Sequence, residues 1–133
     1  KHDMFCVGAS GWSFGAPADS PVPQDERKFG IHAGTVETSI MLYLRPDLVK
    51  MEHAKNHHGL LAQVEESYKH LRIIGSTYVG WQAQDLHEGG CSGDASKAER
   101  WIGELYVEHI TTSFAELLVE IAAYPLSEIK NRP

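Results

Sequence analysis

Residues 32–39 read His-Ala-Gly-Thr-Val-Glu-Thr-Ser and continue at 40–49 as Ile-Met-Leu-Tyr-Leu-Arg-Pro-Asp-Leu-Val. This stretch places an imidazole (His32) and a carboxylate (Glu37) five positions apart, just before an apolar run. Histidine changes charge near neutral pH, and glutamate can act as an acid, a base or a metal ligand. Gly34 between them leaves room for a ligand or for close approach of backbone. The segment is therefore a candidate for chemistry.

The apolar run itself predicts a helix over residues 36–44. Val36, Ile40 and Leu44 are four residues apart, so they share one face of a helix. Pro46 disfavours helical geometry at the residue before it, so the helix should end near Leu44 or Arg45. Burial of this face would hold the His32–Glu37 segment in place.

The rest of the chain reads as short elements and one long helix. We expect a buried strand at 4–10, a Pro-rich loop at 15–30, helical turns within 47–70 and an extended segment or strand at 72–82. Asp94 is a good N-cap for a long helix that Pro125 ends. The apolar stripe of that helix comprises Ala98, Trp101, Ile102, Leu105, Ile110, Phe114, Leu117, Leu118 and Ile121. This mixture predicts the α/β class.

The composition argues against several classes of partner. The 133 residues suit one domain, and the net charge of −6 argues against a nucleic-acid partner. No apolar run is long enough to span a membrane, so we expect no membrane partner. Two cysteines, Cys6 and Cys91, favour free thiols in a reducing compartment, and hence a cytoplasmic location.

The segment at 32–49 resembles the signature of the creatininase family, the creatinine amidohydrolase-like metallohydrolases. A second block, Gly-Trp-Gln-Ala-Gln-Asp-Leu at 80–86 followed by Gly-Asp-Ala-Ser-Lys-Ala at 93–98, is similar to that family too, as is Gly-Trp-Ser-Phe at 11–14. Together these motifs cover nearly the whole chain. The resemblance implies a three-layer α/β/α fold.

The motifs that supply most of the family's metal ligands do not occur here. These are a Glu-x-His pair, an Asp and an Asn-Gly-His-Gly segment. The resemblance therefore implies that residues 1–133 form the C-terminal part, about half, of a creatininase-like domain.

The resemblance also implies roles for four residues. His32 would be the catalytic acid–base group, Glu37 a metal ligand or a neighbour of the metal, and Trp12 and Gly34 would contact the substrate. Two divalent ions of zinc, manganese or iron would serve hydrolysis of a C–N bond in a small amide, cyclic amide or formamide. Ile31 departs from creatininase itself, which has an acidic residue there, so creatinine is a poor guess for the substrate.

Several alternatives stay open from the residues alone. His32 can be a polar loop residue, Glu37 can simply favour the start of a helix, and Trp12 can be a packing residue. The histidines at 53 and 57 would share a helix face and could chelate a metal, although these two and His58 more often form a solvated surface.

The function has an alternative as well. The chain could be a non-catalytic interaction or assembly module, or an inactive truncated half-domain. In either case we expect a homo-oligomer or a complex with the complementary N-terminal half, because half of a layered fold leaves edges and faces uncovered.

Overall fold

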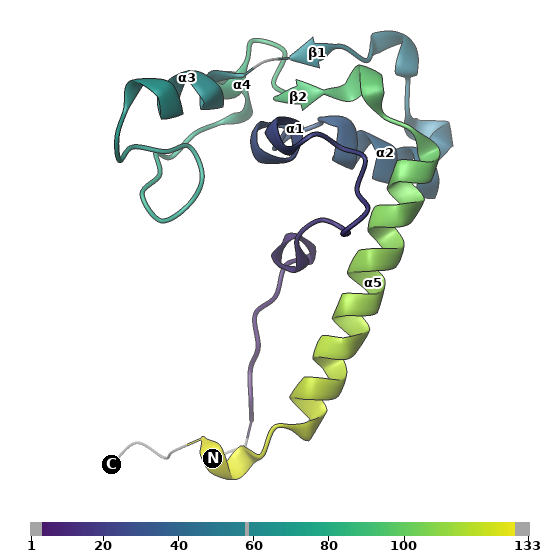
Figure 1. The fold of residues 1–133 in the computed structure, drawn as a ribbon, viewed down its shortest axis with the longest axis vertical. Coiled ribbons are helices and arrows are strands. Elements are labelled where there is room, and N and C mark those ends of the chain that lie inside the picture. Colours follow the sequence, from purple (N-terminus) through teal and green to yellow (C-terminus); the bar gives the residue numbers. More distant parts are fainter. Residues whose placement is uncertain (1–3, 58, 130–133) are drawn as a thin grey trace.

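The computed structural model describes residues 4–57 and 59–129. It has a packed end and a long projecting arm, which consists of most of the last long helix and of the extended residues 4–10 (Figure 1). With η for a 3-10 helix, the elements are η1 (Gly11–Phe14), α1 (Gln24–Phe29), α2 (Thr35–Leu44), η2 (Pro46–Leu48), η3 (Met51–His53), β1 (Asn56–His57), α3 (Leu60–Ser67), α4 (Ala83–Leu86), β2 (Gly93–Asp94), η4 (Ala95–Lys97), α5 (Arg100–Ala123) and η5 (Leu126–Glu128).

Helix α2 confirms the helix predicted at 36–44. Gly34 is its N-cap, and it ends at Leu44, directly before Arg45 and Pro46. Val36 is buried and Ile40 packs against the same core cluster, as the four-residue spacing predicts, whereas Leu44 at the end of the helix is exposed. Local sequence signals therefore determine this element.

Helices α2 and α5 pack together very closely. A Cβ atom on Gly103 of α5 would lie 1.9 Å from the carbonyl oxygen of Ser39 on α2, so only glycine permits this approach. The contact is covered by a small core cluster of Val22, Val36, Ile102 and Tyr106. The Tyr106 hydroxyl lies 2.8 Å from Ser20 Oγ, which satisfies its polar end.

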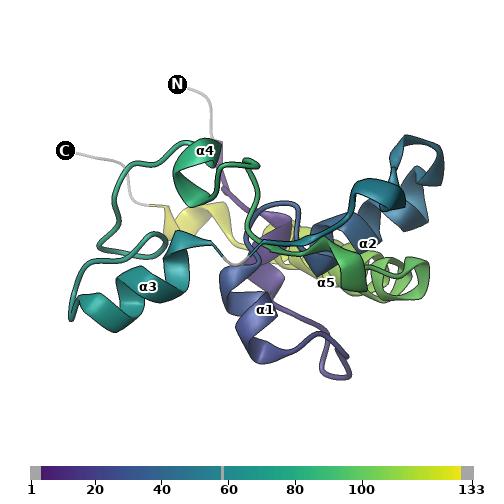
Figure 2. The same cartoon turned by 90° about the horizontal axis from the view of Figure 1, so that it is seen from above.

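A second cluster lies under α3 and α4. It comprises Leu61, Val64, Ile73 and Leu86, with Phe29 and Ile31 packed against it. Seen from above, α3 and α4 lie on one side of α1, and α2 and α5 on the other (Figure 2). The described residues thus have two small cores instead of one.

The sheet is minimal. Strands β1 and β2 pair antiparallel, with Asn56 opposite Asp94 and His57 opposite Gly93. The predicted strand at 4–10 is wrong, because this segment is exposed and pairs with no strand among the described residues.

The predicted extended segment at 72–82 is also wrong as a strand. It is a loop that closes on itself through one bridge between Arg72 and Tyr78. The Trp81 indole N–H donates to the Ile73 carbonyl at 3.0 Å, so this aromatic side chain helps to close the loop. The short helical turns predicted within 47–70 are present as η2, η3 and α3.

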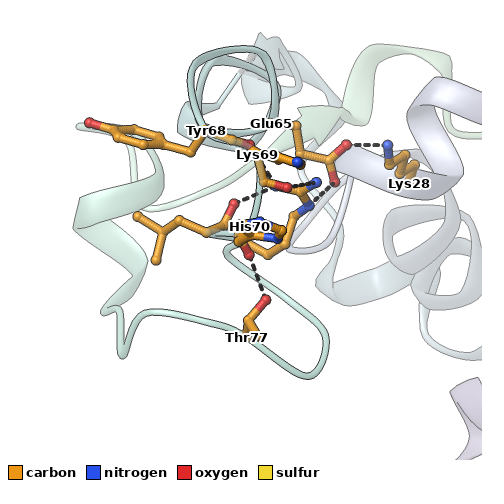
Figure 3. A network of polar contacts seen from close by, with 8 residues as sticks. Lys28, Glu65, Tyr68, Lys69, His70 and Thr77 are labelled. Carbon is orange, nitrogen blue, oxygen red and sulfur yellow. Dashed lines mark hydrogen bonds and ion pairs between the residues drawn. The ribbon is translucent and has the colours of Figure 1, made fainter.

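Polar contacts join this loop to α1 and α3 (Figure 3). Glu65 pairs with Lys28 and lies 3.9 Å from Arg72 Nε. The Arg72 guanidinium also donates to the carbonyls of Tyr68, at 2.8 Å, and Leu71, at 2.6 Å. These exposed pairs shape the loop and contribute little to stability.

Helix α5 confirms the predicted long helix, but its start and its burial differ from expectation. Asp94 caps η4 and not α5, because its carboxylate accepts the Ser96 N–H at 3.1 Å. Of the predicted stripe, only Ala98, just before α5, and Ile102 are buried, whereas Phe114 is 46% and Leu118 51% exposed. Among the described residues no helix is both long and apolar enough to cross a membrane.

Candidate functional site

Backbone hydrogen bonds fix the position of His32. It forms an isolated antiparallel bridge with Ser92, in which His32 N–H donates to the Ser92 carbonyl at 3.3 Å and Ser92 N–H donates back at 2.8 Å. The next residue, Ala33, has a φ of 55°, a conformation that residues other than glycine seldom adopt. This turn carries the chain from the bridge into α2 and leaves the imidazole on the surface.

Glu37 lies in the first turn of α2, beside this bend. Its Oε2 accepts the Ala33 N–H at 2.6 Å and lies 3.8 Å from His32 Nδ1. The latter distance is an ion-pair distance and too long for a hydrogen bond. The His32 and Glu37 side chains remain 49% and 34% exposed, so a ligand can reach both. The structure thus brings together the two residues that the sequence singled out.

Glu26 holds this region together, and the sequence analysis missed it. Its carboxylate accepts N–H groups from Thr35, at 2.8 Å, and from Asp94, at 3.0 Å. Because Gly30, Gly34 and Gly93 lack a Cβ, the carboxylate can fit among them. A Cβ on Gly93 would lie 2.7 Å from Glu26 Oε1 and from the Cα atoms of the other two glycines. The φ of Gly93, +130°, also requires glycine. Only the folded chain brings these residues together.

A cavity of about 480 Å³ opens beside Glu26. Its walls include Thr35, His57, Asp94 and Lys97. His32 and Glu37 are not in its lining, so the cavity and the candidate catalytic pair are neighbours and not one site.

The other predicted site residues have mixed placements. Gly34 is buried at the start of α2, where a Cβ would lie 2.5 Å from Glu26 Oε1, so its observed role is close packing. Trp12 lies on η1, which packs on α5, and its side chain is 56% exposed. Trp12 lines neither this cavity nor a smaller cavity beside Ile31. Contact of either residue with a substrate stays a prediction.

The motif around Pro46 is a local turn. Arg45 Nε and Nη2 donate to Asp47 Oδ1 and Oδ2 at 2.9 and 2.7 Å. The guanidinium lowers the pKa of Asp47 below its ordinary value, and the carboxylate raises the pKa of Arg45. The pair is exposed, so it shapes the turn and contributes little to stability.

Three potential metal ligands gather elsewhere: His57, His87 and Cys91, all half-buried, with donor atoms within 4.8 Å of one another. Cys6 and Cys91 are free thiols, and burial raises the pKa of Cys91. The alternative in which His53 and His57 share a helix face is excluded, because His53 ends η3 and His57 lies on β1. His58 lies outside the described residues.

The chain belongs to the creatininase family. The sequence model of that family, described as creatinine amidohydrolase, matches residues 1–118. No curated protein sequence matches the chain significantly.

A solved structure shares the fold. It is named as a putative creatinine amidohydrolase from Bacteroides fragilis, with a TM-score of 0.64 and 24% sequence identity over 89% of this chain. The chain spans 43% of the length of that protein. The predicted creatininase-like α/β class is therefore confirmed, and the chain represents part of such a fold.

Proposed function

We propose that this chain supplies the acid–base part of a metal-dependent amidohydrolase that cleaves a C–N bond in a small amide, cyclic amide or formamide. The observation that carries the proposal is the pairing of an accessible His32 with Glu37 at the start of α2. Family membership supports hydrolysis of the amidohydrolase type.

His32 can perform the proton transfer that such a reaction needs. An amide nitrogen leaves poorly unless it is protonated, and imidazole can take up and return a proton near neutral pH. Glu37 lies 3.8 Å from Nδ1, on one side of the ring, which leaves Nε2 to exchange the proton. The Ala33 N–H keeps the carboxylate in this position.

The His32–Glu37 pair does not complete a metal site. It offers two side-chain donors, whereas a catalytic zinc normally has three protein ligands. In an assembled enzyme, divalent ions such as zinc, manganese or iron would activate water and polarise the carbonyl. The remaining donors would come from outside residues 1–133, in the complementary N-terminal part of the domain.

A second candidate function is a non-catalytic assembly module, and the exposed surface favours association with a partner. The chain exposes 9696 Å², whereas a folded monomer of 14.8 kDa should expose about 7,000 Å². The excess is what an incomplete domain would show before it binds its partner, whether that partner is catalytic or not. A cytoplasmic location remains a prediction from the two free thiols.

The test is amide hydrolysis by the chain assembled with a family segment that carries the missing ligands. A panel of formamides and cyclic amides would be assayed with added zinc, manganese or iron. We expect His32→Ala to lower kcat by about 10²–10⁴, with metal content unchanged.

His70→Ala, which alters another exposed histidine, is the matched control and should turn over normally. Equal turnover in His32→Ala would remove His32 from the mechanism. A stable assembly without turnover on the whole panel would favour the non-catalytic module.

A further inference from the structure

A group of three side chains beside the two-stranded sheet shares no residue with the His32–Glu37 pair. His57, His87 and Cys91 each offer one donor atom, and the three atoms lie within 4.8 Å of one another. The two imidazole rings are 4.5 Å apart between centroids. In a tetrahedral zinc site, bonds of about 2.0–2.3 Å hold donors roughly 3.5 Å apart, so small side-chain movements suffice.

The sheet explains why these residues meet. His57 on β1 lies opposite Gly93 on β2, and Cys91 precedes Gly93 by two residues. A turn closed by the Gly90 N–H and the His87 carbonyl, at 2.8 Å, then brings His87 back beside β1. Backbone pairing therefore brings the three ligands together, although His57 and His87 are thirty positions apart in the sequence.

Gly89 leaves the space between the three donors free. A Cβ on this residue would lie 3.2 Å from His87 Nδ1, 3.4 Å from His57 Cε1 and 3.6 Å from Cys91 Sγ. The φ of Gly89 is not in the left-handed region, so its backbone does not require glycine. The missing side chain opens a small space that faces all three ligands.

We propose that His57, His87 and Cys91 bind one zinc ion. Two imidazoles and a thiolate are a donor set that suits zinc and disfavours magnesium, calcium and manganese. On binding, Cys91 would release its thiol proton to solvent. Three protein ligands leave a fourth position for water.

The ion would have a structural consequence at the candidate catalytic pair. Ser92 directly follows Cys91 and forms the backbone bridge that holds His32. An ion bound to Cys91 and His57 would join the segment before this bridge to β1. The site stands on its own three ligands and does not depend on the proposed amidohydrolase activity.

The test compares two triple variants of equal composition. The site variant is His57→Gln, His87→Gln and Cys91→Ser. The control variant is His53→Gln, His70→Gln and Cys6→Ser, which changes the same residue types at exposed positions. Zinc binding is measured by calorimetry, and Co²⁺ serves as a spectroscopic probe, because a thiolate ligand gives a charge-transfer band in the near ultraviolet.

The wild-type chain and the control should bind one ion per chain and show the cobalt–thiolate band. The site variant should bind zinc at least about tenfold more weakly and lack the band. Gly89→Ala keeps all three ligands and should weaken binding by partly filling the space, which tests the site even if the triple variant folds poorly. No zinc binding by the wild type, or equal binding by the site and control variants, would overturn the proposal.

Discussion

The two halves of helix α5 have similar apolar content but very different surroundings. At its N-terminal end, Ile102 and Tyr106 are 6% and 3% exposed against α2. Further along, Phe114, Leu118 and Val119 are 46%, 51% and 69% exposed on the arm. The sequence specifies an apolar helix throughout, but only its first turns bury their apolar side chains. Further along, the Phe114 ring makes an edge contact with Phe14 of η1 and stays exposed. The arm therefore has the composition of a core element but remains largely exposed.

The largest expected effect is at the packed end. Gly103→Ala should lower the free energy of unfolding by at least about 3 kcal/mol, because the new methyl group would collide with backbone of α2. Helix propensity alone predicts the opposite, a gain of about 1 kcal/mol. Urea denaturation followed by circular dichroism distinguishes the expected loss from the expected gain. A Gly103→Ala variant more stable than the wild type would show that α2 and α5 do not approach each other so closely.

Truncation of one apolar side chain in each half of α5 tests the comparison directly. Ile102→Ala should cost about 2–3 kcal/mol, since it opens a cavity in a small cluster. Leu118→Ala should change the stability of the isolated monomer by less than about 0.5 kcal/mol. If both variants lose the same free energy of unfolding in dilute solution, measured by the same denaturation, Leu118 is already buried in the monomer.

The arm should also mediate association. We expect the chain to self-associate at micromolar concentration, and Phe114→Glu with Leu118→Glu should weaken this association at least tenfold, about 1.4 kcal/mol. Thr112→Glu with Ala123→Glu adds the same charge on the opposite side of the helix and is the control. A single wild-type species at 14.8 kDa in sedimentation experiments would contradict the expectation.

A smaller loss of stability than for Gly103→Ala is expected at Glu26, whose carboxylate joins segments of the packed end. Glu26→Gln should cost about 1–2 kcal/mol, because the neutral amide weakens the hydrogen bonds from Thr35 and Asp94. Asp25→Asn, an exposed neighbour, should be close to neutral. If thermal unfolding finds both variants equally stable, the carboxylate does not contribute to the packed end.

The sequence predicted correctly those features that depend on residues close together along the chain. The spacing of Val36, Ile40 and Leu44 and the position of Pro46 sufficed for α2, and the bend after His32 places Glu37 beside it. The strand predicted at 4–10 failed because an apolar run cannot show whether a pairing strand exists.

The missed residues depend on contacts between distant segments. Glu26 matters because Gly30 and Gly34, which follow it closely in the chain, and the distant Gly93 surround its carboxylate. His87 and Cys91 approach His57 only through the pairing of β1 with β2. Neither arrangement leaves a periodic pattern in the sequence, so propensity and spacing could not have found it.

One contact has a consequence for the order of folding. The backbone N–H of Glu99, directly before α5, donates to Ser39 Oγ at 3.0 Å, and Ser39 is fully buried on α2. The longest helix therefore begins at a hydroxyl group sixty residues earlier in the chain. Since a helix is costly to nucleate and this start depends on a distant segment, docking of α2 and growth of α5 should be one kinetic event. In a Ser39→Ala variant, refolding should slow while unfolding changes little, because the contact already exists at the barrier.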